Sequence, residues 1–282
     1  TICSGSSTTL SGDFVAGASY NWSPGGNGQS LLVSPLSTTT YALDVRIGSC
    51  YSKDTVVVTV NPKPIVNAGL DVNICEADTA TLTATGALTY LWSNNNTINP
   101  IKVSPIVTTT YKVTGTDING CSGTDDVIVN VITRPIADAG DNQTICLGET
   151  VTLKATGGST YTWNTAPITI GSNVTVSPII TSTYTVTVVN ANGCSASDNV
   201  IVRVNPIPVA DAGSDETICI GNSITLYASG GDSYLWNNGI PSSTNPVNPV
   251  LTTTYIVTVT TLGCTDNDTV VVTVLPTPVV NA

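Results

Sequence analysis

The chain has 282 residues, with 8 Lys and Arg against 19 Asp and Glu, a formal net charge of −11 and no His. So acidic a chain is a poor match for a polyphosphate backbone, and without His it has no Ser-His-Asp or Cys-His nucleophile system and no His-ligated zinc. No apolar run approaches the roughly 18–20 residues of a membrane helix, so we expect neither a nucleic-acid partner nor membrane insertion.

An internal repeat of about 72 residues organises the chain. Each copy contains, in order, an I-C pair, T-L, Y-x-W, a T-Y pair after a Thr/Ser run, a second Cys, D-x-V-x-V-x-V and a proline-rich joint. We expect repeat 1 at residues 1–62 with a truncated first strand, repeat 2 at 63–135, repeat 3 at 136–206 and repeat 4 at 207–276. Residues 277–282 are expected to begin a further repeat or a linker.

Short segments rich in Val, Thr, Ile and Tyr alternate with period two, and no segment keeps a helical period. In residues 127–131, for example, Val127, Val129 and Val131 share one face of a strand. This pattern predicts an all-β fold of four tandem Ig-like or PKD-like β-sandwich domains in an extended rod.

Two aromatic series fit this class. The recurring Trp should lie in the core on a central strand. The Tyr that opens the next-to-last strand should form a tyrosine corner, in which its hydroxyl bonds to the backbone. A binding platform with exposed Trp rings stacked on sugars is the alternative for the first series. The Trp series is Trp22, Trp92, Trp163 and Trp236, and the Tyr series is Tyr41, Tyr111, Tyr184 and Tyr255.

Eight cysteines occur, two in each repeat, which predicts disulfides and an oxidising compartment: an extracellular position or a bacterial cell surface. We expect one disulfide per domain, tying the first strand to the beginning of the last. Bridges between neighbouring repeats would contradict this interpretation. The expected pairs are Cys3–Cys50, Cys75–Cys121, Cys146–Cys194 and Cys219–Cys264.

Acidic residues recur at two places. One set follows the proline-rich joints and could hold a structural calcium ion, the one cofactor considered, although a capped turn with solvated acids is the simpler interpretation. The other set precedes the last strand, where its carboxylates should accept backbone N–H bonds. The candidate calcium ligands are Asp71, Asp138, Asp141, Asp211 and Asp215, and the second set is Asp54, Asp125, Asp198 and Asp268.

The string A-D-A-G-x-D-x-T-I-C-x-G-x-x-x-T-L-x-A-x-G-G at residues 210–231, followed by Y-x-W, resembles the PKD-like and Ig-like repeats of large Bacteroidota surface proteins. These proteins are exported by the type IX system and include gliding-motility adhesins of the SprB kind. The S-x-D-x-D-G turn of typical PKD domains is absent, so their calcium loop is not carried over. The resemblance also implies O-glycans at Thr55, Thr79 and Thr269.

These observations favour a non-enzymatic stalk of a bacterial surface adhesin or extracellular filament, with gliding motility as one setting. Its partners would be other copies of the array, and a surface polysaccharide or substratum. One alternative is a carbohydrate- or matrix-binding module of a secreted enzyme. Another is a filament subunit in which residues 279–282 complete the first strand of the next protomer.

Overall fold

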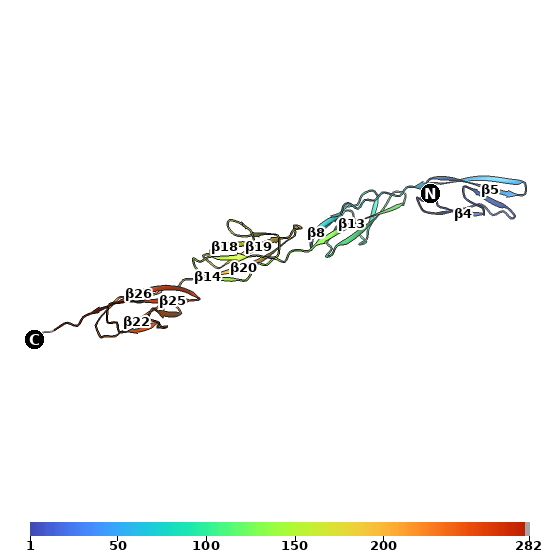
Figure 1. Cartoon of the computed structure of the whole chain (residues 1–282). Helices are drawn as coiled ribbons and strands as arrows, with labels where there is room; N and C mark the ends of the chain where they lie inside the picture. The colour runs from blue at the N-terminus through green and yellow to red at the C-terminus, as the bar shows by residue number, and fades with distance from the viewer. Residues whose placement is uncertain (280–282) are drawn as a thin grey trace. The chain divides into compact units, whose positions relative to one another are not determined.

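In the computed structural model, which describes residues 1–279, every regular element is a β-strand (Figure 1). The strands form four consecutive sets, one for each repeat, and each set contains a larger sheet facing a two-stranded sheet. The chain divides into two units, Thr1–Thr133 and Arg134–Ala282, which are described separately. The fold is therefore all-β, with four tandem Ig-like sandwiches.

Repeat 2 shows the common plan. Its larger sheet has the order β10-β12-β13-β8, and its smaller sheet pairs β9 with β11. The last two strands form a hairpin in which Thr116 pairs with Ser122. The strands are β8 (Val72–Cys75), β9 (Ala80–Leu82), β10 (Thr89–Trp92), β11 (Ile101–Val103), β12 (Thr109–Thr116) and β13 (Ser122–Ile132).

Repeat 1 has the same plan with shorter pairings. A three-stranded sheet of order β3-β5-β6 faces the pair β2 and β4, and β1 pairs with β7. The strands are β1 (Ile2–Cys3), β2 (Thr8–Ser11), β3 (Ser19–Ser23), β4 (Ser30–Val33), β5 (Thr39–Ile47), β6 (Cys50–Val58) and β7 (Val60–Asn61).

Repeats 3 and 4 repeat the plan of repeat 2, and repeat 3 adds a short edge strand, β17. In repeat 3 the strands are β14 (Gln143–Cys146), β15 (Val151–Lys154), β16 (Thr160–Trp163), β17 (Thr169–Ile170), β18 (Asn173–Val176), β19 (Ser182–Val189) and β20 (Ser195–Asn205). In repeat 4 they are β21 (Glu216–Cys219), β22 (Ile224–Tyr227), β23 (Ser233–Trp236), β24 (Thr244–Val247), β25 (Thr253–Thr261) and β26 (Cys264–Leu275).

The first strand of each larger sheet runs parallel to the last strand of the same repeat. In repeat 3, Gln143 pairs with Val202 and Cys146 with Asn205, so β14 and β20 finish at the same end of the sandwich. Repeats 2 and 4 have the same register. The first-strand cysteine therefore lies where the chain leaves the domain, which decides how the cysteines pair.

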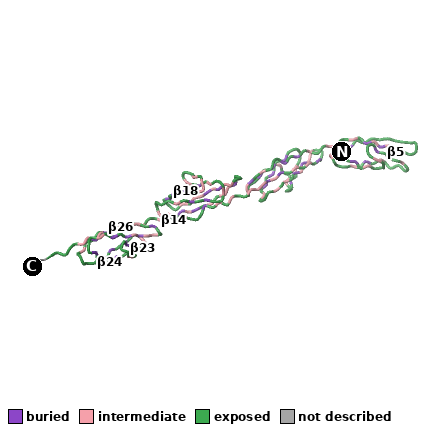
Figure 2. Tube along the Cα trace, viewed as in Figure 1, coloured by how far each residue is buried: buried purple, intermediate pink, exposed green. Residues whose placement is uncertain are grey.

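Each repeat has its own hydrophobic core between its two sheets (Figure 2). The four Trp side chains lie in these cores at 0–5% exposure, which confirms the predicted core role and leaves none as a surface platform for sugars. Val127 and Val129 of β13 are also buried, as their alternation predicts. Alternating burial along the strands is what a half-buried sheet requires.

The prediction of the tyrosine corner is wrong about which Tyr series forms it. The hydroxyls that bond to the backbone belong to the Tyr two residues before each Trp; Tyr161, for instance, donates to the carbonyl of Gly158 at 2.7 Å. In the described part of the chain, the series that opens the next-to-last strand makes no hydroxyl bond, and burial raises the pKa of Tyr184 and Tyr255. The bonding series is Tyr20, Tyr90, Tyr161 and Tyr234.

Candidate functional site: the joints between repeats

Disulfides join neighbouring repeats, which overturns the expected pairing within each repeat. Cys3 of repeat 1 is bonded to Cys121 of repeat 2, with a Cα–Cα distance of 5.5 Å. Cys146 of repeat 3 is bonded to Cys264 of repeat 4, at 5.6 Å. Both pairs are 118 residues apart in the sequence, so one arrangement occurs twice.

The other four cysteines differ in their state. Cys75 and Cys194 are disulfide-bonded. Cys50 and Cys219, expected to be bonded, are free and exposed. Of the eight cysteines predicted to form disulfides, the structure thus bonds six, and none of the four predicted pairs forms.

Strand direction explains why the predicted pairing fails. Cys146 pairs with Asn205 at the end of β20, whereas Cys194 directly precedes the beginning of β20. An 11-residue strand spans roughly 36 Å, and a disulfide needs Cα atoms within about 7 Å. The two cysteines of repeat 3 therefore lie at opposite ends of the sandwich, and Cys146 bonds instead to Cys264 of repeat 4.

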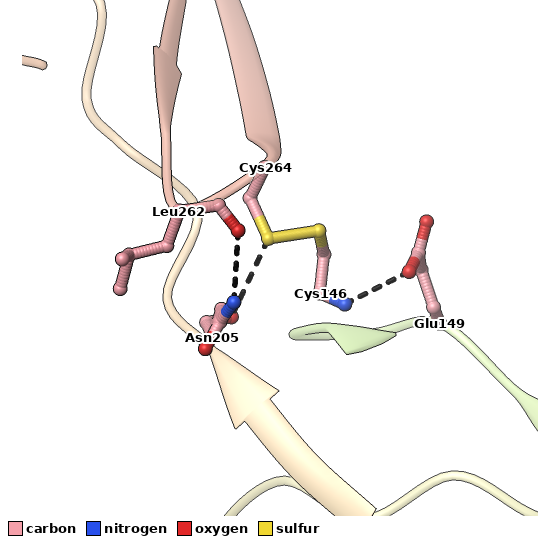
Figure 3. The surroundings of a disulfide bond; sticks show 5 residues. All are labelled: Cys146, Glu149, Asn205, Leu262 and Cys264. Atoms are coloured by element: carbon pink, nitrogen blue, oxygen red, sulfur yellow. Dashed lines mark hydrogen bonds between the residues drawn. A yellow bond between two sulfur atoms is a disulfide. The ribbon is translucent and has the colours of Figure 1, made fainter. Parts of the chain in front are cut away.

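Polar contacts surround the Cys146–Cys264 bond (Figure 3). The side-chain amide of Asn205, at the end of β20, donates to the carbonyl of Leu262 in the β25–β26 turn at 2.9 Å. The backbone N–H of Cys146 donates to Glu149 Oε2 at 2.8 Å. The Cys264 sulfur lies 4.0 Å from the Asn205 carbonyl oxygen, a van der Waals contact because a bonded sulfur has no proton. The joint is thus closed by a covalent bond and by the hydrogen bond from Asn205 to Leu262.

The hairpin turn that carries Cys264 has an unusual backbone. Leu262 has φ 52° and Gly263 has φ 85°. Two consecutive left-handed residues are typical of a tight type I′ hairpin turn, where Asn-Gly is the favoured sequence. Asn119-Gly120 and Asn192-Gly193 precede the matching cysteines in repeats 2 and 3, but there the turn is longer and only the Gly has a positive φ, 79° and 86°. Leu262 is a strained exception, held at the joint by the Asn205 amide.

The recurring acid lies within the last strand, and not before it as predicted, and it anchors the segment that enters repeats 2, 3 and 4. The Oδ2 atoms of Asp125, Asp198 and Asp268 each accept an N–H at 2.8 Å, from Ala68, Ala139 and Ala212 respectively. This confirms the predicted role as acceptors of backbone N–H bonds. The backbone N–H of Ala139, together with that of Asn199, holds the pKa of Asp198 below its ordinary value, and the N–H groups of Ala212 and Thr269 do the same for Asp268.

The five candidate calcium ligands do not gather into one cluster. Asp138 and Asp211 each accept the N–H two residues further on, as capped turns do, and Asp71 and Asp215 accept N–H groups of the last strand. The carbonyl of Asp141 accepts the Gln143 amide. Among residues 1–279, no group of three or more His, Cys, Asp and Glu side chains could hold a metal ion. A structural calcium stays a prediction.

The three candidate glycosylation sites are exposed. Thr55 lies in β6 and Thr269 in β26, while Thr79 directly precedes β9 and its hydroxyl lies 2.8 Å from Ser104 Oγ. Exposure leaves the hydroxyls of Thr55 and Thr269 accessible to a modifying enzyme. Glycosylation at these sites stays a prediction.

No family model matches the chain, and no curated protein matches it. Among solved structures, immunoglobulin domains 1–4 of Sidekick-1 are 12% identical, cover 98% of this chain and 96% of that one, and give a TM-score of 0.32. The insect immune protein hemolin is also 12% identical, with 98% and 97% covered and a TM-score of 0.32.

A three-domain immunoglobulin fragment of titin is 13% identical, covers 75% of this chain and 98% of that one, and gives a TM-score of 0.39. Because these identities and scores are low, the Ig-like assignment depends on the strand order and pairing described above. No helix in the described part of the chain is long and apolar enough to cross a membrane.

Proposed function

We propose that the chain is a non-enzymatic structural stalk in which Ig-like domains are clamped to one another at their joints. The observation that carries this proposal is the pair of disulfides between consecutive repeats, Cys3–Cys121 and Cys146–Cys264. A disulfide across a joint restricts the rotation of one domain relative to the next. This restriction makes the stalk stiffer and keeps it extended. From the sequence we expected a disulfide within each domain. The structure instead has disulfides that join one domain to the next.

The proposed location is extracellular, at a cell surface, because structural disulfides persist in oxidising compartments. The sequence resemblance extends the proposal to an adhesin of a bacterial surface, exported by the type IX system, with gliding motility as a setting. Its partners would then be other copies of the array and a surface polysaccharide or substratum. Analysis of cell fractions with an antibody against the chain tests this location.

Small-angle scattering of the oxidised chain, and of a variant without the Cys146–Cys264 bond, tests the proposed stalk. Strands of about 11 residues make each domain roughly 36 Å long, so four domains in line give a maximum dimension on the order of 150 Å. We expect that dimension in the oxidised chain, and a more flexible particle when Cys146 and Cys264 are both replaced by Ser. A globular oxidised chain would contradict the proposal. So would a variant that is no more flexible than the oxidised chain.

A carbohydrate-binding module of a secreted enzyme is the rival function. Burial of all four Trp rings removes the stacking platform that this rival was expected to use. The exposed aromatic side chains are Phe14, Tyr51 and Tyr227. A glycan array would favour the rival if binding depended on these three residues.

A further inference from the structure

The Lys and Arg residues of this chain occupy only two kinds of position. All eight are among the described residues: six lie in β-strands, and the other two directly precede a proline. Lys63 and Arg134 are the two that precede a proline, and both lie in proline-rich joints. The strand residues are Arg46 in β5, Lys53 in β6, Lys102 in β11, Lys112 in β12, Lys154 in β15 and Arg203 in β20.

The six strand residues expose their side chains but not their backbones. All six side chains are exposed, those of Arg46 and Lys53 at 57% and 62%. Each of the six residues is nevertheless paired with a residue of a neighbouring strand. A protein surface that recognises an extended peptide pairs with its backbone, and in these six residues the backbone is already part of a sheet.

The bond after Lys154 is enclosed as well, although Lys154 is the last residue of β15. The next residue, Ala155, is 2% exposed, and its N–H donates to the Ser172 carbonyl at 2.7 Å. After each of the other five, the next residue lies in the same strand. A protease therefore reaches these six bonds only after local or global unfolding of the domain.

The two joints are more open, and a proline lies at the critical place in each. Residues 62–66 and 133–137 belong to no strand, and the Lys63 and Arg134 side chains are exposed. The bonds that follow them are Lys63–Pro64 and Arg134–Pro135. Proline has no N–H and its ring fixes φ, so the bond before it is a tertiary amide that trypsin-type proteases cut poorly. The joints at 205–208 and 275–278 contain neither Lys nor Arg.

Other residue types are not placed in this way. Asp78 and Asp117 lie outside the strands, in the loops that follow β8 and β12. Leu36, Leu70 and Leu251 also lie outside strands, and they are 78%, 89% and 75% exposed. The chain therefore has open loops with exposed side chains, and the basic residues are the ones kept out of them.

We propose that this placement makes the folded chain resistant to proteases that cut after Lys or Arg, while proteases that cut after Leu still attack it. A trypsin-type enzyme recognises the basic side chain through a carboxylate in its S1 pocket, and a chymotrypsin-type enzyme has a hydrophobic pocket there. The first enzyme finds basic side chains only beside bonds that it does not hydrolyse. The second finds leucines in exposed loops, which are the preferred places for proteolytic cleavage.

This property goes beyond the proposed stalk, because it names the class of enzyme beside which the chain persists outside the cell. The protection has two separate causes: strand pairing for six bonds and proline for two. Each cause is tested below with its own pair of variants, after a test of the protection as a whole.

Two proteases of known specificity test the whole protection. The oxidised full chain is incubated with trypsin or with chymotrypsin, each at the amount that digests the reduced, urea-unfolded chain at the same rate. The intact band is followed on a reducing gel. We expect the folded chain to last at least tenfold longer in trypsin than in chymotrypsin. Equal lifetimes would show that general compactness decides the resistance and would overturn the proposal.

One joint supplies a matched pair of proline variants. Pro64→Ala leaves an ordinary bond after Lys63, and trypsin should cut this variant at least tenfold faster than the wild type, into residues 1–63 and 64–282. Pro62→Ala removes a proline from the same joint but keeps the Lys63–Pro64 bond, so its lifetime in trypsin should not change. An unchanged lifetime in chymotrypsin shows that both variants are folded. If Pro64→Ala were as resistant as Pro62→Ala, the proposal would be overturned for the joints.

Two Lys substitutions in repeat 2 compare a loop with a strand. Thr97 and Thr124 are both exposed, but Thr97 lies between β10 and β11 and Thr124 lies in β13. Trypsin should cut Thr97→Lys after residue 97 at least tenfold faster than it cuts Thr124→Lys after residue 124. Equal rates would mean that strand pairing gives no protection, which overturns the proposal for the strands. The scattering test of the stalk depends on the disulfides and is independent of all three results.

Discussion

Cys146 and Cys264 lie 5.6 Å apart between their Cα atoms although they belong to different repeats. Cys146 ends β14 of repeat 3, and Cys264 begins β26 of repeat 4. Cys3 and Cys121 have the same relationship in repeats 1 and 2. The recurring unit of this chain is therefore a pair of domains with their joint, and the stability of one domain should depend on its neighbour.

Cys146→Ser and Cys264→Ser should have the same effect, although the residues lie in different repeats. Each removes the bond that closes the unfolded chain of repeat 3 and of repeat 4, which the chain-entropy model values at roughly 3–5 kcal/mol. Both repeats should lose stability together in either variant. Hydrogen exchange resolved by peptide measures this for each domain.

Cys219→Ser is the control for these variants, because Cys219 is free. In a monomeric sample it should leave the unfolding free energy of repeat 4 unchanged. If Cys264→Ser destabilised repeat 4 alone, the bond would not couple the stability of repeat 3 to that of repeat 4.

Leu262→Asn should stabilise repeat 4. Leu262 adopts φ 52°, a left-handed conformation that costs an ordinary side chain roughly 1–2 kcal/mol and that Asn tolerates better. We expect a gain of about 0.5–1 kcal/mol in urea unfolding, with the joint disulfide intact. Leu251→Asn, an exposed leucine with no positive φ, should give no gain.

Asp198→Asn should destabilise repeat 3 at neutral pH by roughly 1–2 kcal/mol, because the carboxylate no longer accepts the Ala139 N–H as a charged group. The pKa of Asp198 is lowered in the folded chain. Its stabilisation is therefore present above the unfolded pKa of about 3.9 and is lost as the pH falls through the folded pKa. The variant should lose less stability than the wild type between pH 7 and pH 3 in urea titrations.

Asp54→Asn is the matched change in repeat 1. Its carboxylate accepts only the Thr55 N–H among the described residues, so the loss at pH 7 should be smaller. An equal loss in both variants would mean that the entering segment does not depend on the acid.

Trp163→Phe should cost about 1–2 kcal/mol more than Trp92→Phe. Both rings are buried, but Trp163 Nε1 donates to the Gly171 carbonyl at 3.2 Å, whereas Trp92 Nε1 has no hydrogen-bond partner in the described part of the chain. Replacing Trp163 leaves an acceptor unpaired, and replacing Trp92 removes a donor that was already unpaired. Thermal unfolding of the two variants gives the comparison.

Period-two alternation was enough to predict the sandwiches and their Trp cores, because burial follows the pleat of a strand. It could not predict the disulfides, because spacing says nothing about strand direction. Each repeat has two cysteines at a similar separation, Cys146 and Cys194 in repeat 3, yet the parallel pairing of β14 with β20 sets these two at opposite ends of the domain. The parallel pairing of the first strand with the last strand could not be derived from the sequence.

The tyrosine corner was assigned to the wrong series for a related reason. Tyr184 and Tyr161 both lie on core-facing positions, and sequence alternation treats them alike. Only the tight turn at Gly158 brings a free carbonyl to the Tyr161 hydroxyl.

The disulfides also set how far the chain can be drawn out when its ends are pulled. Each of the two bonds between repeats lets the load bypass the 118-residue span between its cysteines. The covalent path then runs through residues 1–3, 121–146 and 264–282 alone. Fully stretched, that path measures roughly 160 Å, against roughly 950 Å for the same chain without bonds. Under tension the oxidised chain would behave as a nearly inextensible tether, even if every domain along it unfolded.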